Sequence, residues 1–130
     1  MRSILFAALS LPIACGAAQA QVQAQAPAPN RCFSISQFRN WRAADDKTLY
    51  IRVGVKDVYR LDLSYSCKAV TWPDARLITT FRGSSTVCTA LDWDIKVGQS
   101  PPSIPVPCMV KKMTALTPAE SAALPKGAKP

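Results

Sequence analysis

Alternating hydrophobic and polar residues in the middle of the chain predict a β-hairpin. Residues 48–54 and 58–65 each place apolar or aromatic side chains at every second position, which is the period of a strand with one buried face. The alternating residues are Leu49, Ile51 and Val53 in the first segment, and Tyr59, Leu61, Leu63 and Tyr65 in the second. Gly54 can adopt a positive φ, so the short polar segment between the two strands is expected to form the turn.

Further strands are expected on both sides of this hairpin. Residues 75–82 are rich in β-branched side chains and predict a third strand, residues 83–85 are a plausible turn before 86–88, and a last strand is expected at 108–116. Between them, the alternation of Leu91, Trp93, Ile95 and Val97 with polar residues predicts an amphipathic strand. The intervening segment 99–107 contains four prolines, which cannot donate ladder hydrogen bonds, and is expected to be a loop or a ragged edge.

Two segments differ from this pattern. Residues 33–42 fit either a strand or a helix, and we favour a strand because apolar or long side chains recur at every second position. Thr117 and Glu120 form a capping-box pattern with Pro118 at the first helical position, which predicts a helix that Pro125 ends. The disulfide-linked β domain is therefore expected over residues 32–124, with a disordered tail at 125–130.

These elements predict an all-β, or at least β-rich, fold with five to six short antiparallel strands and one short C-terminal helix. A small open barrel covers the strand edges most simply, and a two-sheet sandwich is the alternative.

The N-terminal residues have the pattern of an export signal. A single positive residue precedes the mostly apolar run Ile4–Ala14, and small residues at Ala18 and Ala20 fit a cleavage site before Gln21. The apolar run is too short to cross a bilayer. We therefore expect a signal peptide at 1–20, a Gln-, Ala- and Pro-rich flexible linker at 21–31, and export to the periplasm.

Cys15 opens an alternative to simple cleavage. It follows Pro12-Ile13-Ala14, which partly matches the motif that precedes a lipidated cysteine in bacterial lipoproteins, although Pro12 stands where leucine is expected. Lipidation at Cys15 would anchor the protein at the outer membrane.

Four cysteines remain in the folded region: Cys32, Cys67, Cys88 and Cys108. An even number of cysteines in a small exported chain predicts disulfides, and the absence of a C-x-x-C pair argues against a zinc site or a redox dithiol. Three pairings are possible. We favour the nested pairing of Cys67 with Cys88 and Cys32 with Cys108, because the second bridge would then join the two ends of the domain.

Composition excludes most enzyme classes. The 130 residues include no histidine, no Ser-x-x-Lys pattern and no glycine-rich loop, so the usual general base, metal ligand and phosphate cradle are all missing. We expect no catalytic residues, no metal site and no cofactor. The remaining enzymatic hypothesis is a hydrolase that uses Asp92 and Asp94, which would project from the same side of one strand. We favour the simpler interpretation that they are solvent-facing residues, because acidic side chains are expected on the exposed face of an amphipathic strand.

The chain is strongly basic, with 16 Lys and Arg against 8 Asp and Glu, a net charge of +8. If Arg52 and Arg60 lie on the outer face of the hairpin beside Tyr50, they would form a cationic stripe that attracts anionic lipid or polysaccharide. An exported protein rarely meets nucleic acid, so we expect no nucleic-acid partner. Trp41 and Trp93 are expected to fill the core or its rim, whereas Trp72 precedes a proline and is a candidate exposed contact.

The order of these features resembles a family of short exported proteins of Gram-negative bacteria that is classed only as a domain of unknown function. The resemblance covers about Cys32 to Thr117. Its markers are Cys32-Phe33, Thr48-Leu49-Tyr50-Ile51, Val58-Tyr59-Arg60-Leu61, Cys67, Cys88, Cys108 and Leu116-Thr117. This chain has Thr89-Ala90-Leu91-Asp92 where that family usually has a Gly-Asp pair after the third cysteine, so the local turn is expected to differ. The resemblance implies location and architecture, and no activity.

Together these observations predict a non-catalytic periplasmic or envelope-associated binding or structural module whose basic surface faces anionic envelope components. The alternative is a secreted inhibitor or chaperone-like partner of another envelope protein, docking through a strand edge or the proline-rich segment 101–107. The ligand and the oligomeric state are not specified by the sequence.

Overall fold

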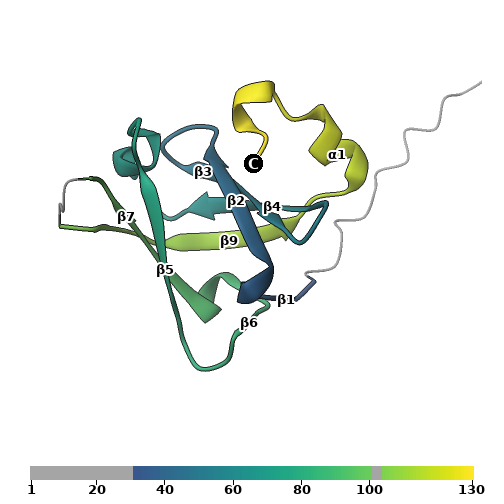
Figure 1. Ribbon diagram of the computed structural model, residues 1–130, viewed down its shortest axis with the longest axis horizontal. Coiled ribbons are helices and arrows are strands. Elements are labelled where there is room, and N and C mark those ends of the chain that lie inside the picture. The colour runs from purple at the N-terminus through teal and green to yellow at the C-terminus, as the bar shows by residue number, and fades with distance from the viewer. Residues whose placement is uncertain (1–30, 101–103) are drawn as a thin grey trace, which may run out of the picture.

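A computed structural model describes residues 31–100 and 104–130, which form three small antiparallel sheets and one α-helix (Figure 1). The strands are β1 (Phe33–Ser34), β2 (Phe38–Ala43), β3 (Thr48–Val53), β4 (Asp57–Leu63), β5 (Arg76–Phe81), β6 (Thr86–Val87), β7 (Trp93–Gly98), β8 (Val106–Cys108) and β9 (Val110–Ala115). The helical elements are the 3-10 helices η1 (Ile35–Gln37), η2 (Lys68–Thr71), η3 (Ala90–Asp92) and η4 (Lys126–Ala128), and the α-helix α1 (Pro118–Ala123). The signal peptide, Cys15 and all of the linker but its last residue lie outside the described residues.

The largest sheet has the strand order β2-β3-β4-β9 and contains the predicted hairpin. Its turn begins at Gly54, which has a φ of +60°, so the positive φ expected of this glycine is confirmed. Residues 49, 51 and 53 of β3 and residues 59, 61 and 63 of β4 are all buried, as the alternation predicted. The core face of this sheet is thus the apolar one, and its opposite face is called the outer face below.

The remaining strands form a three-stranded sheet, β5-β7-β8, and a two-stranded sheet, β1-β6. The β-rich class, the antiparallel pairing and the single short C-terminal helix are confirmed. Nine strands form within the described residues, where five to six were predicted, because η1 interrupts the first predicted strand, Met109 divides the last one, and residues 86–87 form a short strand that pairs with β1. No closed barrel is found among these residues.

Two strand boundaries differ from the prediction for a local reason. The predicted strand that begins at Leu91 begins instead at Trp93, because Thr89 and Asp92 cap η3 and turn the chain before the strand starts. Leu91 is consequently 81% exposed, although the alternation placed it on the buried face. The last predicted strand, 108–116, is divided at Met109 between β8 and β9.

The hydrophobic core lies between the sheets and brings together residues distant in the sequence. Phe33 packs against Tyr59 of β4, with ring centroids 5.0 Å apart, and makes an edge-on contact with Trp93 of β7 at 6.0 Å. The largest fully buried side chains are Leu49, Ile51, Leu61, Val87, Val97 and Cys108. Because strands of all three sheets contribute to this cluster, each sheet depends on the others for its buried face.

Two disulfides link the four cysteines of the folded region, but their pairing differs from the one we favoured. Cys32 is bonded to Cys88, and Cys67 to Cys108. The pairing of β1 with β6 sets Phe33 opposite Val87, which brings the adjacent Cys32 and Cys88 together with a Cα separation of 4.1 Å. The nested pairing of Cys67 with Cys88 and Cys32 with Cys108 was therefore wrong, because it ignored this contact between β1 and β6.

These disulfides indicate an oxidising, extracytoplasmic compartment. Among the described residues no helix is both long and apolar enough to cross a membrane.

The C-terminal segment is ordered in place of the predicted disordered tail. The capping box is confirmed, with Thr117 accepting a hydrogen bond from the Glu120 N–H and α1 ending at Ala123. Beyond Pro125 the chain forms η4, which contacts β2, and Ala128 is only 5% exposed. The physical reason is that Ala128 contributes an apolar contact, while the Lys129 ammonium donates to the Ala122 carbonyl and closes the segment on itself.

Candidate functional site

All eight acidic side chains are engaged in local hydrogen bonds or ion pairs. Asp57, Asp62 and Asp94 form ion pairs with arginines, and Asp92 and Glu120 accept backbone N–H groups at helix starts. The carboxylates of Asp45, Asp46 and Asp74 also accept hydrogen bonds. Their donors are the Lys47 backbone N–H, the Ser66 hydroxyl and the Gln99 side-chain amide, respectively. Over residues 31–100 and 104–130, no cluster of potential metal ligands is found.

Asp92 and Asp94 do not form the paired site considered from the sequence. Asp92 lies in η3, where its carboxylate accepts the N–H groups of Cys88 and Thr89 at 2.8 and 2.6 Å. These backbone hydrogen bonds hold the pKa of Asp92 below its ordinary value. Asp92 is therefore a capping residue, and it does not project from the face of β7 with Asp94.

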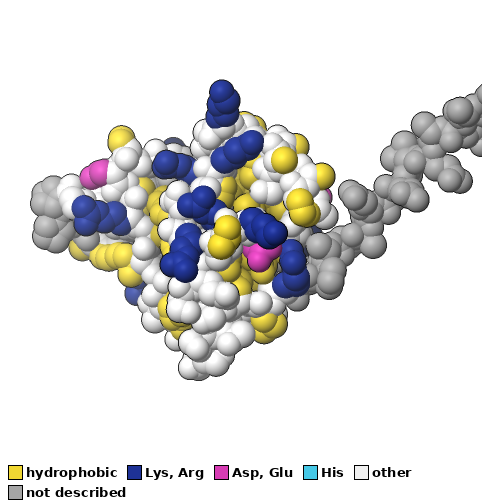
Figure 2. Space-filling view, turned by 45° about the vertical axis from the view of Figure 1, so that its right-hand side comes forward, with side chains coloured by type: hydrophobic (Ala, Val, Ile, Leu, Met, Phe, Trp, Pro, Cys, Tyr) yellow, Lys and Arg dark blue, Asp and Glu magenta, His cyan; other side chains and the backbone are white. Residues whose placement is uncertain are grey.

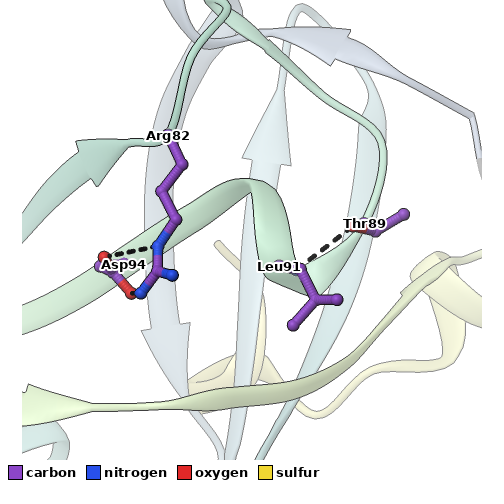
Figure 3. Close-up of polar contacts among 4 residues, drawn as sticks. All are labelled: Arg82, Thr89, Leu91 and Asp94. Atoms are coloured by element: carbon purple, nitrogen blue, oxygen red, sulfur yellow. Dashed lines mark hydrogen bonds and ion pairs between the residues drawn. The ribbon is translucent and has the colours of Figure 1, made fainter.

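Asp94 instead forms a two-point ion pair with Arg82 on the neighbouring chain segment (Figure 3). The Arg82 Nε and Nη2 groups donate to the two carboxylate oxygens at 3.0 and 2.9 Å. The hydrogen bond from Arg82 lowers the pKa of Asp94. A carboxylate that stays ionised and is fully occupied by a guanidinium is a poor general acid or base, so this geometry gives no support to hydrolysis.

The cations greatly outnumber their acidic partners. The described residues contain 15 Lys and Arg, since only Arg2 lies outside them, and only Arg31, Arg60 and Arg82 form ion pairs. The other twelve, 15 − 3, are Arg39, Arg42, Lys47, Arg52, Lys56, Lys68, Arg76, Lys96, Lys111, Lys112, Lys126 and Lys129. Figure 2 shows one face of the molecule on which Lys and Arg side chains are numerous and acidic ones few.

Three arginines surround one tyrosine on the outer face of the four-stranded sheet. Tyr50 lies directly opposite Arg42 of β2 and opposite Arg60 of β4 in the strand register. Arg52 follows Tyr50 by two residues on β3 and so projects from the same face. We call Arg42, Tyr50, Arg52 and Arg60 the arginine–tyrosine row.

The structure thus brings together the three predicted residues Tyr50, Arg52 and Arg60. Arg42 was not predicted as part of this row, because its position depends on the register between β2 and β3. The only sequence signal was the alternation of residues 33–42, which left strand and helix both open.

The members of the row differ in exposure and in partners. Arg42 and Arg60 are exposed. The Arg60 Nε donates a hydrogen bond to the Asp62 carboxylate at 2.8 Å, and this bond raises the pKa of Arg60 above its ordinary value. Arg52 is half-buried, and its buried Nε has no hydrogen-bond partner among the described residues. The row therefore contains one partly neutralised and two unpaired guanidinium groups.

The C-terminal segment lies at one end of this outer face. Val58, opposite Arg52 in the register, is buried although it projects from the outer face. The Leu116 N–H donates to the Val58 carbonyl, and η4 contacts β2. Val58, beside Arg52, is thus covered, whereas Arg42 and Arg60 are exposed.

A separate groove lies where β8 leaves the edge of β7. Trp93 and Ile95 of β7 line it together with Val110, and Leu91 and Met109 flank it. Its volume is about 320 Å³. The indole Nε1 of Trp93 is buried and has no hydrogen-bond partner among the described residues. We call this the Trp93 groove.

The other tryptophans contact the core. Trp72 directly follows η2 and Trp41 lies in β2, and both are partly buried against the hydrophobic cluster. Trp72, considered as an exposed contact because it precedes a proline, is therefore only partly exposed, since it packs against the core.

Comparison with known proteins adds a family but no activity. No curated protein and no solved structure matches the chain. A family model described as a family of unknown function, DUF6491, matches residues 1–129. Since this match covers almost the whole sequence, the chain belongs to the DUF6491 family.

Proposed function

We propose that the protein is a non-catalytic binding module of the periplasm or cell envelope that recognises anionic envelope components, lipid or polysaccharide, through the arginine–tyrosine row. One observation carries this proposal. All eight carboxylates are used in local contacts, while unpaired arginines gather beside Tyr50 on one rigid sheet face.

The chemistry of the row suits an oxyanion. A guanidinium presents a planar fork of N–H donors that matches the oxygens of phosphate and carboxylate groups. Arg42 and Arg60 lie two strands apart with Tyr50 between them, so a phosphate-bearing surface can reach both arginines while the tyrosine ring offers an apolar contact and a hydroxyl. Strands fix these positions before binding, which lowers the entropy lost on association.

Vesicle binding tests the proposal directly. The purified protein is mixed with vesicles of phosphatidylglycerol or of phosphatidylcholine, at low and at high salt, and bound protein is measured by co-sedimentation. We expect binding to phosphatidylglycerol at low salt that weakens as salt is added, because exposed charges are screened. Lipopolysaccharide serves as the second anionic probe.

Variants separate the row from the general positive charge. Arg42→Gln is compared with Arg76→Gln, since both arginines are exposed, lie on strands and lack an ion pair, but Arg76 belongs to β5 in another sheet. The proposal requires Arg42→Gln to weaken binding more than Arg76→Gln does. Equal losses, or binding that does not respond to salt, would contradict it.

A second candidate function is supported by the free edge of β5. This strand pairs only with β7, so its outer edge has no strand partner in the described part of the chain, and Ile78 on it is exposed. An extended segment of another envelope protein could pair with such an edge, which fits an inhibitor or chaperone-like role. Isolation of one stoichiometric partner from periplasm, lost on Thr79→Pro, would favour this function.

The route of export is testable independently. An intact mass distinguishes cleavage before Gln21 from acylation at Cys15, since only the second adds the mass of lipid. Either result leaves the binding proposal intact, because the row lies on the folded domain.

A further inference from the structure

We propose that the Trp93 groove is a binding site for a short acyl chain that carries a carboxylate, such as a free medium-chain fatty acid. This site is separate from the arginine–tyrosine row and does not rest on the function proposed above.

The apolar entrance of the groove is held open by the local structure. Leu91 and Met109 are 81% and 60% exposed, although both side chains are large and apolar. The exposure of Leu91 is fixed by capping: the Leu91 N–H donates to the Thr89 hydroxyl, and Asp92 accepts two backbone N–H groups of the same turn. Figure 3 shows Leu91 projecting from η3 on the far side from the Arg82–Asp94 pair. A large exposed apolar pair beside a groove is typical of a ligand site.

The interior of the groove is lined by buried apolar side chains. Ile95 and Val110 line it, and its volume of about 320 Å³ lies at the small end of the range for ligand pockets. Trp93 also lines it, is 2% exposed, and has an indole N–H that no described group accepts.

The charge at the rim selects an anion. Arg82 and Asp94 line the groove, but they neutralise each other through two hydrogen bonds. Lys96 also lines it and has no ion pair among the described residues, which leaves one uncompensated positive charge. A carboxylate complements this charge, while its chain covers the apolar lining and the flanking Leu91 and Met109.

Titration of the ¹⁵N-labelled protein with decanoate, below the concentration at which it forms micelles, tests this site. The Trp93 indole N–H signal, assigned by its loss in Trp93→Phe, is expected to shift and saturate at one decanoate per protein, while the Trp41 and Trp72 indole signals stay in place. The absence of a saturable Trp93 shift would overturn the proposal. Concentration-dependent shifts without decanoate would also overturn it, because they would show that a second copy of the chain occupies the groove.

Surface variants keep the test valid even if Trp93→Phe fails to fold. Leu91→Ser is compared with Ile104→Ser, since Ile104 is also highly exposed but does not line the groove. We expect Leu91→Ser to weaken decanoate binding about tenfold, the effect of losing roughly half of a buried leucine contact, and Ile104→Ser to leave it unchanged. Equal effects of the two variants would refute the site.

The role of charge is tested with Lys96→Gln and with decanol. Lys96→Gln removes the expected ion pair between the Lys96 ammonium and the decanoate carboxylate, so it should weaken decanoate binding about fivefold. The same variant should bind decanol, which has no charge, as tightly as the wild type does. Wild-type protein that binds decanol as tightly as decanoate would overturn the assignment of an anionic ligand.

Discussion

Cys32 is bonded to Cys88, and this bridge extends the pairing of β1 with β6 by one position. Cys32 immediately precedes Phe33, Cys88 immediately follows Val87, and Phe33 and Val87 are opposite each other in the register. The second bridge, between Cys67 and Cys108, closes a loop of similar length but is buried in the core. The two bridges therefore differ in environment more than in the length of chain that they close.

This difference predicts unequal losses of stability. The separations of 56 and 41 residues give a similar entropic stabilisation, about 4 kcal/mol for each bridge. Removal of the Cys67–Cys108 bridge by replacing both residues with alanine also removes buried sulfur atoms from the core, so we expect it to lower the free energy of unfolding more than the same change at Cys32 and Cys88. Urea denaturation of the two double variants measures the difference.

Peptide mapping checks the connectivity itself. Digestion without reduction should yield peptides that join Cys32 to Cys88 and Cys67 to Cys108. Peptides that join Cys67 to Cys88 would contradict the structure.

The capping role of Asp92 predicts a pH-dependent contribution to stability. Its pKa in the folded protein is lowered from 3.8, the ordinary value, because the carboxylate accepts the N–H groups of Cys88 and Thr89. The ionised group thus stabilises the fold above about pH 4, and this stabilisation is lost as the pH falls through the lowered folded-state pKa. We expect Asp92→Asn to melt at a lower temperature than the wild type at pH 7, and the two to converge towards pH 2.

Thermal melts followed by circular dichroism across this range test the prediction. Asp74→Asn is the control, because Asp74 accepts a hydrogen bond from the half-buried Gln99 side chain and caps no helix. If the melting temperatures of Asp92→Asn and the wild type differed by the same amount at every pH, the ionised carboxylate of Asp92 would not be the cause of the difference in stability.

The hairpin turn predicts a specific effect at Gly54. This residue has a φ of +60°, a backbone conformation that disfavours any side chain with a Cβ atom, although no atom would clash with the added group. Gly54→Ala is therefore expected to lower stability by about 1 kcal/mol. Gly127→Ala in η4 is the matched control, since its surroundings are equally open and its φ is not positive, and it should leave stability nearly unchanged.

The outer face predicts unequal effects when the charge of either exposed arginine is removed. Arg42 and Arg60 lie on either side of Tyr50, so both should contact the same anionic surface. We expect Arg42→Gln to weaken binding to phosphatidylglycerol vesicles about fivefold at low salt. Arg60→Gln should have a smaller effect, because Asp62 already offsets part of its charge. A larger effect at Arg60 than at Arg42 would contradict this account of the row.

Local patterns predicted the fold well where the structure depends on neighbouring residues. The β3–β4 hairpin follows from alternation and one glycine, and α1 follows from the Thr117 and Glu120 cap. The exposure of Leu91 was missed because its alternation with Asp92 was interpreted as part of a strand. The Thr89-Ala90-Leu91-Asp92 segment has the spacing of a capping box, and this signal could have revealed η3.

Contacts between distant segments were not predictable in the same way. The disulfide pairing depends on β1 meeting β6, and the position of Arg42 depends on the register of β2 against β3. The Trp93 groove depends on where β8 diverges from β7. In each case the packing of whole strands decides the outcome, and a single sequence contains no local residue pattern that reports it.

The alternating order of the paired cysteines has a consequence for biogenesis. During N-to-C-terminal translocation Cys67 emerges before Cys88, so an oxidase that joins thiols in their order of appearance would first link Cys32 to Cys67, which are not partners in the folded protein. Maturation then requires that this early link be exchanged. The yield of native protein should accordingly depend on a disulfide isomerase as well as on an oxidant.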